Sequence, residues 1–322
     1  MRRVAIALVA VLAAAPLDRA AAASDWPNKP VRIVVAYAAG GANDLLARVF
    51  AEQLGKAFGQ QFFVENRTGG SGLIGTEAVA RAAPDGYTLQ ASGMPSHVLA
   101  PAMNKNVAFD PMRDFTHIAY LGGPPNVFVV HPSLGVNSFK ELLELMRKEP
   151  GGVQYVSPAI GAVGNMVAEY VAAKENVKLV HVAYRGGGAA IQDLIAGHVK
   201  VGSMTISTTR PHILAGKLKA LAVSSAQRLP EFPDLPTLVE LGYPELVTTT
   251  WYALSGPAGL PRDIVDKLNA ATNRAIDLPE VQKHLTTGMI QTKRMTPAEM
   301  TAFMQAEIDK WAPIARRIAE QK

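Results

Sequence analysis

The stretch VRIVVAYAAGGANDLLAR, from Val31 to Arg48, decides the fold. Its first five residues are mostly apolar and β-branched, which predicts a buried strand. A small-residue loop then ends in two glycines, and apolar residues recur at helical spacing after it. We expect Asn43 to cap this helix and Asp44, in its first turn, to pair with Arg48 four residues later.

A strand, a loop and a helix N-terminus in this order aim free backbone N–H groups at one point, and such a point attracts anions. The two glycines let the backbone approach a ligand closely. The stretch therefore predicts a loop that holds a carboxylate. A tight strand-to-helix turn without a ligand explains the same residues, and this stretch alone does not separate the two interpretations.

The first 23 residues differ from the rest of the chain. Arg2 and Arg3 precede an apolar run, Val4 to Ala15, and residues 21–23 offer an A-x-A cleavage site. This pattern predicts a secretory signal peptide over residues 1–23. A retained membrane anchor is the alternative, although the run is shorter than the ~20 residues that a span needs.

Composition narrows the classes of protein. The chain has 322 residues, 48% of them hydrophobic, which suffices for one large domain or two ordinary ones. The formal net charge of +5 is too small and too scattered for a nucleic-acid partner. The chain has no cysteine, which excludes disulfides, thiolate catalysis and cysteine metal sites. For an exported protein of this size, that composition favours the bacterial periplasm.

Glycine-rich segments follow three further predicted strands, at residues 66–75, 157–165 and 184–188, and each leads into a predicted helix. Within the first of these segments, residues 70–75 match the dinucleotide fingerprint G-x-G-x-x-G. The acidic residue expected ~20 positions later is missing. We therefore expect a second glycine-rich loop beside the same cleft, with a flexible turn as the alternative.

Strands alternate with helices along the chain, which predicts an α/β fold with mainly parallel sheets flanked by helices. Ligands of such sheets lie beyond the carboxyl ends of the strands. Residues 122–125 are rich in glycine and proline and predict a crossing between domains. We expect one domain at residues 24–124 plus 248–322, a second at 125–247, and the ligand cleft between them.

Jointly, these motifs resemble the extracytoplasmic solute receptors of tripartite tricarboxylate transport systems, the Bordetella-type uptake group. The resemblance extends over the whole mature chain and rests on residues 37–44, 65–75, 84–89, 184–187 and 256–261. It implies a two-domain, Venus-flytrap periplasmic binding protein of the type II-like topology. It also implies a carboxylate held largely by backbone amides and ordered water from the 37–44 and 157–165 loops.

Two departures from the family pattern stand out. The family usually has prolines before the double glycine, where this chain has Ala38 and Ala39. The strand after Gly197 usually carries an acid, where this chain has Lys200. The first departure loosens the loop or makes room for a different ligand, and the second affects surface charge.

The resemblance implies a receptor that captures a small organic carboxylate and delivers it to membrane transporter subunits. Monocarboxylates, dicarboxylates and aromatic acids all fit this class. We expect a monomer with no catalytic residue, no cofactor, no metal and no nucleic-acid partner. The expected ligand-binding residues are Tyr37, Ala38, Ala39, Gly40, Gly41, Ala42, Asn43, Asp44, Ser92, Ser157, Pro158, Ala159, Gly164, Asn165, Arg185, Gly186 and Thr205.

Each of these side chains also has a structural interpretation. Arg185 is the natural charged contact for a carboxylate, and a surface arginine in a turn fits equally well. Ser92, Ser157 and Thr205 offer hydroxyl donors but suit turns and caps as well. Asn165, like the asparagine of the opening helix, is expected mainly as an N-cap.

An exported enzyme is the rival class. The chain has no Gly-x-Ser-x-Gly elbow and no His-Glu-x-x-His motif, and its seven histidines lack metal-ligand spacing. A Ser/His/Asp triad stays open because only geometry tests it. A receptor that presents its ligand to a sensor uses the same cleft as a transport receptor, so the sequence leaves those two roles open.

Overall fold

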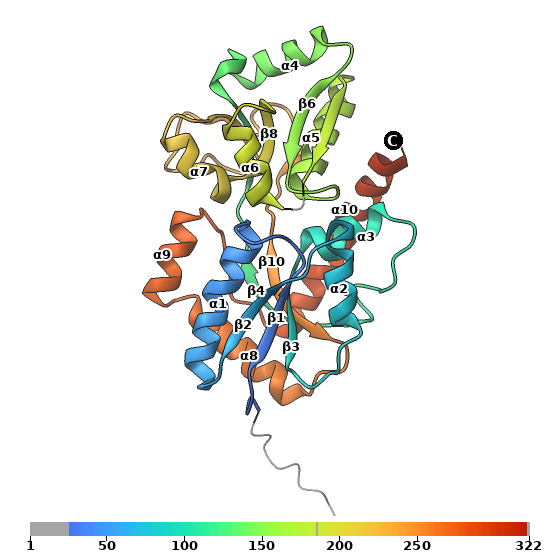
Figure 1. The fold of residues 1–322 in the computed structure, drawn as a ribbon, viewed down its shortest axis with the longest axis vertical. Helices are drawn as coiled ribbons and strands as arrows, with labels where there is room; N and C mark the ends of the chain where they lie inside the picture. Colours follow the sequence, from blue (N-terminus) through green and yellow to red (C-terminus); the bar gives the residue numbers. More distant parts are fainter. Residues whose placement is uncertain (1–25, 185, 321–322) are drawn as a thin grey trace, which may run out of the picture.

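Two five-stranded sheets, each flanked by helices, form two domains stacked along the long axis of the molecule (Figure 1). The computed structural model describes residues 26–184 and 186–320. The predicted signal peptide and Arg185 lie outside the described residues.

The first domain is built on the sheet with strand order β2-β1-β3-β10-β4, in which β10 runs opposite to the other four strands. Its strands are β1 (Val31–Val35), β2 (Phe62–Asn66), β3 (Thr88–Gly93), β4 (Phe115–Gly122) and β10 (Tyr252–Pro257). Its helices are α1 (Ala42–Phe58), α2 (Leu73–Ala80), α3 (Ala100–Met103), α8 (Arg262–Ala275) and α9 (Pro279–Thr287), with short turns η1 (Gly70–Gly72) and η2 (Met94–Leu99).

The second domain is built on the sheet with order β7-β6-β8-β5-β9, in which β5 runs opposite to the rest. Its strands are β5 (Asn126–Val130), β6 (Val153–Ser157), β7 (Leu179–Ala183), β8 (Val201–Thr205) and β9 (Lys219–Val223). Its helices are α4 (Phe139–Lys148), α5 (Val163–Glu175), α6 (Gly187–Ile195) and α7 (Ile206–Leu214), with turns η3 (Pro132–Leu134) and η4 (Pro244–Leu246).

The two sheets share one topology, because β1-α1-β2 of the first corresponds to β6-α5-β7 of the second. In each sheet the strand that runs opposite, β10 or β5, follows a passage of the chain from the other domain. The two passages lie side by side: Pro125 pairs with Thr249, and Thr250 N donates to Pro124 O at 2.8 Å.

Local sequence signals explain where α4 begins. The Ser138 hydroxyl accepts a hydrogen bond from Glu141 N at 3.2 Å, and the Glu141 carboxylate accepts one from Asn137 N at 2.8 Å. This differs from the standard capping box in one respect, because the Glu141 carboxylate accepts from the N–H of the residue before the cap and not from that of Ser138. The sequence pattern predicts a helix over residues 139–148 with Ser138 as its cap, and strands over residues 126–130 and 179–183. The bounds of α4, β5 and β7 agree with these predictions.

Helices begin earlier than the sequence predicted wherever they follow a glycine-rich loop. The N-cap of α1 is Gly41 and that of α5 is Ala162, so Asn43 and Asn165 lie inside their helices and the prediction of both as caps was wrong. Residues 205–209 are rich in serine and threonine, which predicts a connection between elements, but four of these five residues belong to α7. Helix starts without a capping side chain carry no sequence signal, which explains these differences.

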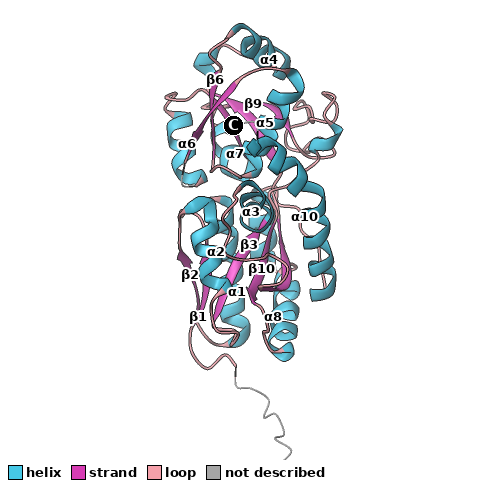
Figure 2. Cartoon of the chain, turned by 90° about the vertical axis from the view of Figure 1, so that its right-hand side faces the viewer, coloured by secondary structure: helices cyan, strands magenta, loops and turns pink. Residues whose placement is uncertain are grey.

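The last helix, α10 (Pro297–Glu320), packs against both domains. Its buried residues Trp311, Ala315 and Ile318 join one apolar cluster with Met166 of α5 and Leu99 of η2. Figure 2 shows α10 rising along the first domain towards the second. Within residues 26–184 and 186–320, no helix combines the length and apolarity that a bilayer crossing requires.

Candidate functional site

A cavity of about 40 Å³ lies between the two domains, at the carboxyl ends of strands from both sheets. Side chains and backbone from the first turns of several helices line it, together with the two passages between domains. The lining residues are Tyr37, Ala38, Gly41, Ala42, Asn43, Asp44, Pro95, Asn126, Pro158, Ala162, Val163, Gly164, Gly186, Gly187, Thr205, Thr208, Thr250 and Tyr252.

The N-termini of α1, α5, α6 and α7 meet at this cavity, since the first residues or N-caps of all four belong to its lining. None of these four helices has a side-chain hydrogen bond at its N-cap. The first turn of an α-helix has backbone N–H groups without a partner inside the helix, and it carries a partial positive charge. The cavity therefore offers converging donors suited to an anion.

Asp44 is the only acidic residue among the described lining residues, and its charge is balanced within the first domain. Its carboxylate accepts hydrogen bonds from Arg48 at 2.9 and 3.0 Å, from Gly40 N at 3.0 Å and from Asn66 at 2.9 Å. Burial raises the pKa of Asp44, but these hydrogen bonds outweigh burial and hold that pKa below its usual range. The predicted Asp44–Arg48 pair is confirmed.

No lysine, arginine or histidine occurs among the described residues that line the cavity. An anion bound there would be held by backbone dipoles and hydroxyl groups, as charge-assisted hydrogen bonds allow. Arg185, the expected charged contact, lies outside the described residues.

Loops of the two domains touch beside the cavity. A Cβ atom added to Gly186 would lie 3.0 Å from the Ala38 Cβ, and one added to Gly188 would lie 2.9 Å from Ala39 O. The loop before α1 and the loop before α6 are thus in van der Waals contact across the interface. The backbones of these two loops close the cavity on this side, and they leave no room for a side chain at Gly186 or Gly188.

Ten of the expected binding residues line the cavity: Tyr37, Ala38, Gly41, Ala42, Asn43, Asp44, Pro158, Gly164, Gly186 and Thr205. Ala39, Gly40, Ala159 and Asn165 belong to the same loops or first turns without lining it. Ser92 and Ser157 are fully buried and serve the fold: Ser92 Oγ lies 2.7 Å from Ser255 Oγ, and Ser157 Oγ lies 2.7 Å from His181 Nε2.

Gly164 lines the cavity, but close packing is what demands a glycine there. A Cβ at this position would lie 2.0 Å from Ser203 O, so α5 and β8 approach too closely for any side chain. At Gly41 a Cβ would meet nothing nearer than 3.7 Å. The two glycines therefore differ in role, although the sequence presents them alike.

Eight lining residues were not expected from the sequence: Pro95, Asn126, Ala162, Val163, Gly187, Thr208, Thr250 and Tyr252. Ala162, Val163 and Gly187 belong to loops that the sequence did single out. Asn126, Thr250 and Tyr252 come from the two passages between domains, and Pro95 comes from η2. The pairing of the two passages places Asn126, Thr250 and Tyr252 at the cavity. No local sequence motif indicates that position.

The glycine-rich segment after β2, residues 66–75, contacts the cavity-lining residue Tyr37. Gly72 has φ of 95°, and a Cβ there would lie 2.7 Å from the Tyr37 hydroxyl. That hydroxyl donates to Ser71 O at 3.1 Å. The segment itself does not line the cavity. Of its glycines, Gly72 lies close to Tyr37, which is a lining residue.

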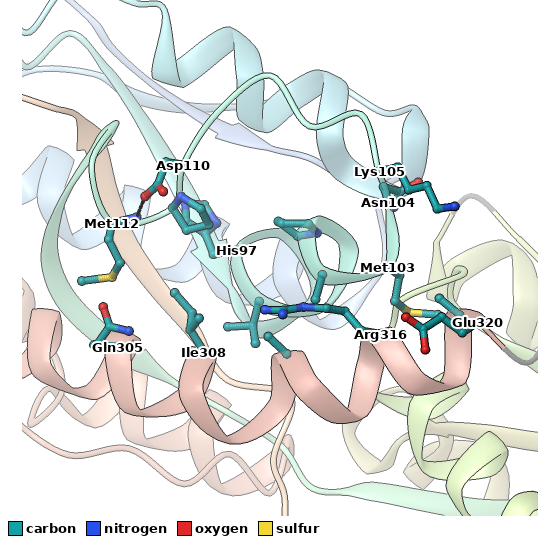
Figure 3. A pocket seen from close by; sticks show the side chains of 16 residues that line it. His97, Met103, Asn104, Lys105, Asp110, Met112, Gln305, Ile308, Arg316 and Glu320 are labelled. Atoms are coloured by element: carbon teal, nitrogen blue, oxygen red, sulfur yellow. Dashed lines mark hydrogen bonds between the residues drawn. The ribbon is translucent and has the colours of Figure 1, made fainter.

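A wider groove of about 840 Å³ lies between α3, residues 104–112 and α10. Figure 3 shows His97 and Asp110 on one side of it and Gln305, Ile308 and Arg316 of α10 on the other. Charges of both signs line this groove. No helix of eight or more residues begins there among the described elements, so it lacks the converging donors of the interdomain cavity.

Residues 46–319 match the family model described as the tripartite tricarboxylate transporter family receptor. The chain belongs to this receptor family. The family expected from the sequence is confirmed, as is the two-domain α/β fold. The receptor family is one of periplasmic solute-binding proteins and is not an enzyme family.

One curated relative of this receptor is protein BugT of Bordetella pertussis, 31% identical over 306 residues that cover 95% of this chain and 94% of BugT. A Rhodopseudomonas palustris protein solved with adipate is 30% identical, covering 92% of this chain and 98% of that one, with a TM-score of 0.87. MatC of the same organism, solved with bound malate, is 31% identical over 90% of this chain and all of that one, with a TM-score of 0.85.

A solved structure of the periplasmic binding protein BugD is 31% identical, covers 91% of this chain and 98% of that one, and has a TM-score of 0.85. In the part of the receptor that the structure describes, no three His, Asp or Glu side chains gather so as to hold a metal ion.

Proposed function

We propose that this receptor captures a small organic carboxylate in the periplasm, holds it between its two domains and delivers it to the membrane subunits of a tripartite tricarboxylate transporter. The observation that carries the proposal is the convergence of four uncapped helix N-termini on one cavity. Two similar receptors were solved with the carboxylates adipate and malate, which supports the ligand class.

Backbone recognition suits this task. A carboxylate has two oxygens that each accept more than one hydrogen bond, and helix N-termini from opposite domains offer donors from both sides. Ala42 of α1 belongs to the first domain, whereas Val163 of α5 and Gly187 of α6 belong to the second. A ligand that bridges these groups favours the closed arrangement of the domains, because only that arrangement makes both sets of contacts.

The location and extent of the mature receptor belong to the same proposal. Removal of residues 1–23 after export places the mature chain in the periplasm, where it acts as a monomer. Residues 24–124 with 248–322 form the domain of β1, and residues 125–247 form the domain of β5. Helix α10 belongs to the domain of β1 but also packs against α5 of the domain of β5. Domain closure would therefore shift α5 relative to α10.

The test is a thermal-unfolding screen of residues 24–322 against a library of mono-, di- and tricarboxylates and aromatic acids. A ligand at a hundredfold excess over its Kd stabilises the folded chain by about 2.7 kcal/mol. Stabilisation by one chemical group of acids, and not by their amides, supports the proposal. A flat response from folded chain that has been freed of co-purified ligand contradicts it.

A further inference from the structure

Three buried oxygen atoms at the cavity have no hydrogen-bond partner within residues 26–184 and 186–320. They are Asn43 Oδ1, Asn126 Oδ1 and Thr250 Oγ1, and we call them the acceptor set. The three residues line the cavity and are 4%, 2% and 5% exposed. Buried polar atoms are paired in the great majority of cases, so three orphans at one cavity call for a partner.

The orientation of Asn43 follows from its neighbour. Its Nδ2 donates to Ala91 O at 3.0 Å. A backbone carbonyl only accepts, so the amide nitrogen must face Ala91 and the amide oxygen is the atom left over. Asn126 is less strictly oriented, because its Nδ2 lies 2.8 Å from Ser203 Oγ, a hydroxyl that both donates and accepts. With Nδ2 on Ser203, Oδ1 is the atom left unpaired.

Amide oxygens require donors, whereas an ionised carboxylate has none. The helix N-termini around the cavity are themselves donors and match the carboxylate. The cavity thus carries two complementary requirements: something that accepts at the helix N-termini, and something that donates to Asn43 Oδ1, whose orientation is fixed. The Thr250 hydroxyl can accept or donate, so a carboxylate can satisfy it, but a plain dicarboxylate leaves Asn43 Oδ1 unpaired.

We propose that the ligand is a carboxylic acid that also carries a hydrogen-bond donor, a hydroxyl or an ammonium group, and that the acceptor set receives this donor. This inference rests on the proposed function and narrows its ligand class. The family does not decide the matter, because the similar structures hold both adipate, which has no such group, and malate, which has a hydroxyl.

The test measures binding of matched acids to residues 24–322 by titration calorimetry. The sets are succinate with malate and aspartate, propionate with lactate and alanine, and phenylacetate with mandelate. In the set that fits the cavity, we expect the hydroxy or amino acid to bind about tenfold tighter, or more, than the acid without the donor. The members of each set identify whether the donor is a hydroxyl or an ammonium.

Two variants locate the recognition. Asn126→Ala and Thr250→Val each remove one atom of the acceptor set, and at least one of them should shrink the affinity ratio within the matched set. The ratio is the readout because a change in cavity size alone affects every acid of the set. Thr272→Val is the control, since Thr272 Oγ1 is also buried and unpaired but belongs to α8, away from the cavity.

Equal binding of all acids in a set overturns this inference and leaves the proposed function standing, with water as the partner of the acceptor set. A ratio that neither variant changes also overturns it. Binding of no acid at all contradicts the proposed function itself.

Discussion

Asp44 and Asn165 occupy equivalent positions in the two domains. Each is the third residue of the helix that follows the second strand of its sheet, β1 or β6, and each accepts a hydrogen bond from the backbone N–H of a glycine four residues earlier. Asp44 Oδ2 lies 3.0 Å from Gly40 N, and Asn165 Oδ1 lies 3.1 Å from Gly161 N. Both glycines have positive φ, 82° and 74°. The two loops at the cavity therefore have the same construction, with a charged side chain in one and a neutral one in the other.

Asp44→Asn gives the first loop the neutral amide side chain that the second loop has at Asn165. We expect the variant to fold and to lose about 1–2 kcal/mol at neutral pH, since the amide oxygen still accepts from Gly40 while the ionic bonds to Arg48 are lost. Arg48 is half exposed, so its unpaired charge remains solvated. Denaturant unfolding of both proteins measures the difference.

This difference should depend on pH. The pKa of Asp44 is held below its ordinary value of 3.8, so the folded chain binds that proton more weakly than the unfolded chain. The stabilising contribution is therefore present above that value and is lost as the pH falls through the folded pKa. The stabilities of wild type and Asp44→Asn should converge as the pH falls below 3.8, and a constant gap would contradict this.

Gly164→Ala and Gly41→Ala separate packing from binding. We expect Gly164→Ala to destabilise the chain by about 3 kcal/mol, because its Cβ would lie 2.0 Å from Ser203 O. Gly41→Ala introduces no clash and should change stability by less than about 1 kcal/mol. Thermal unfolding without ligand checks both.

Gly41→Ala, which should change stability little, is expected to affect ligand binding. The methyl group of Gly41→Ala enters the cavity lining and should weaken carboxylate binding by about tenfold, or 1.4 kcal/mol. Gly187→Ala is the matched variant on the second domain, where a Cβ would meet nothing nearer than 3.8 Å. Unchanged affinity in both variants would mean that the ligand does not approach these backbones.

Domain closure should be visible in solution. The loops before α1 and α6 are in contact in this structure, so its scattering profile represents the closed form. We expect small-angle scattering of the ligand-free chain to show a larger radius of gyration than that of the saturated chain. Identical profiles would contradict ligand-driven closure.

A buried histidine pair should make the chain sensitive to acid. Burial, with a smaller contribution from His117, lowers the pKa of His97 well below its usual value, and burial lowers the pKa of His117 to about 4. The unfolded chain binds these protons near pH 6.5, so stability falls as the pH drops from there towards 4, by about 1.4 kcal/mol per unit for each histidine.

His97→Phe removes one of these groups and suits its surroundings, because the His97 ring lies 4.5 Å from that of Phe115. The variant should show a shallower fall in melting temperature between pH 6.5 and 4. His284→Gln, at an exposed position of α9, is the control and should leave the slope unchanged. An unaltered slope in His97→Phe would show that the pair does not set the acid sensitivity.

The alternation of strands and helices was sufficient to predict the α/β class, because periodicity and turn residues are local signals. The two-domain organisation was inferred from the glycine- and proline-rich residues 122–125 and from the family resemblance. Caps were predicted well where a side chain makes them, as at Ser138, and poorly where none does, as at Gly41. The loops that contribute lining residues were also identified, since strand, glycine and helix follow one another in the chain. Asn126 and Thr250 were missed because their place depends on pairing between segments more than a hundred residues apart.

The four helix starts that face the cavity have no cap of their own, and this makes the ligand a missing part of the fold. In α4 the Ser138 hydroxyl completes the first turn, and before α10 the Thr296 hydroxyl does so. At the cavity the bound ligand would accept these hydrogen bonds, so the chain alone does not supply every hydrogen-bond partner of its native structure. We therefore expect the unfolding temperature of the receptor to rise with the concentration of its ligand.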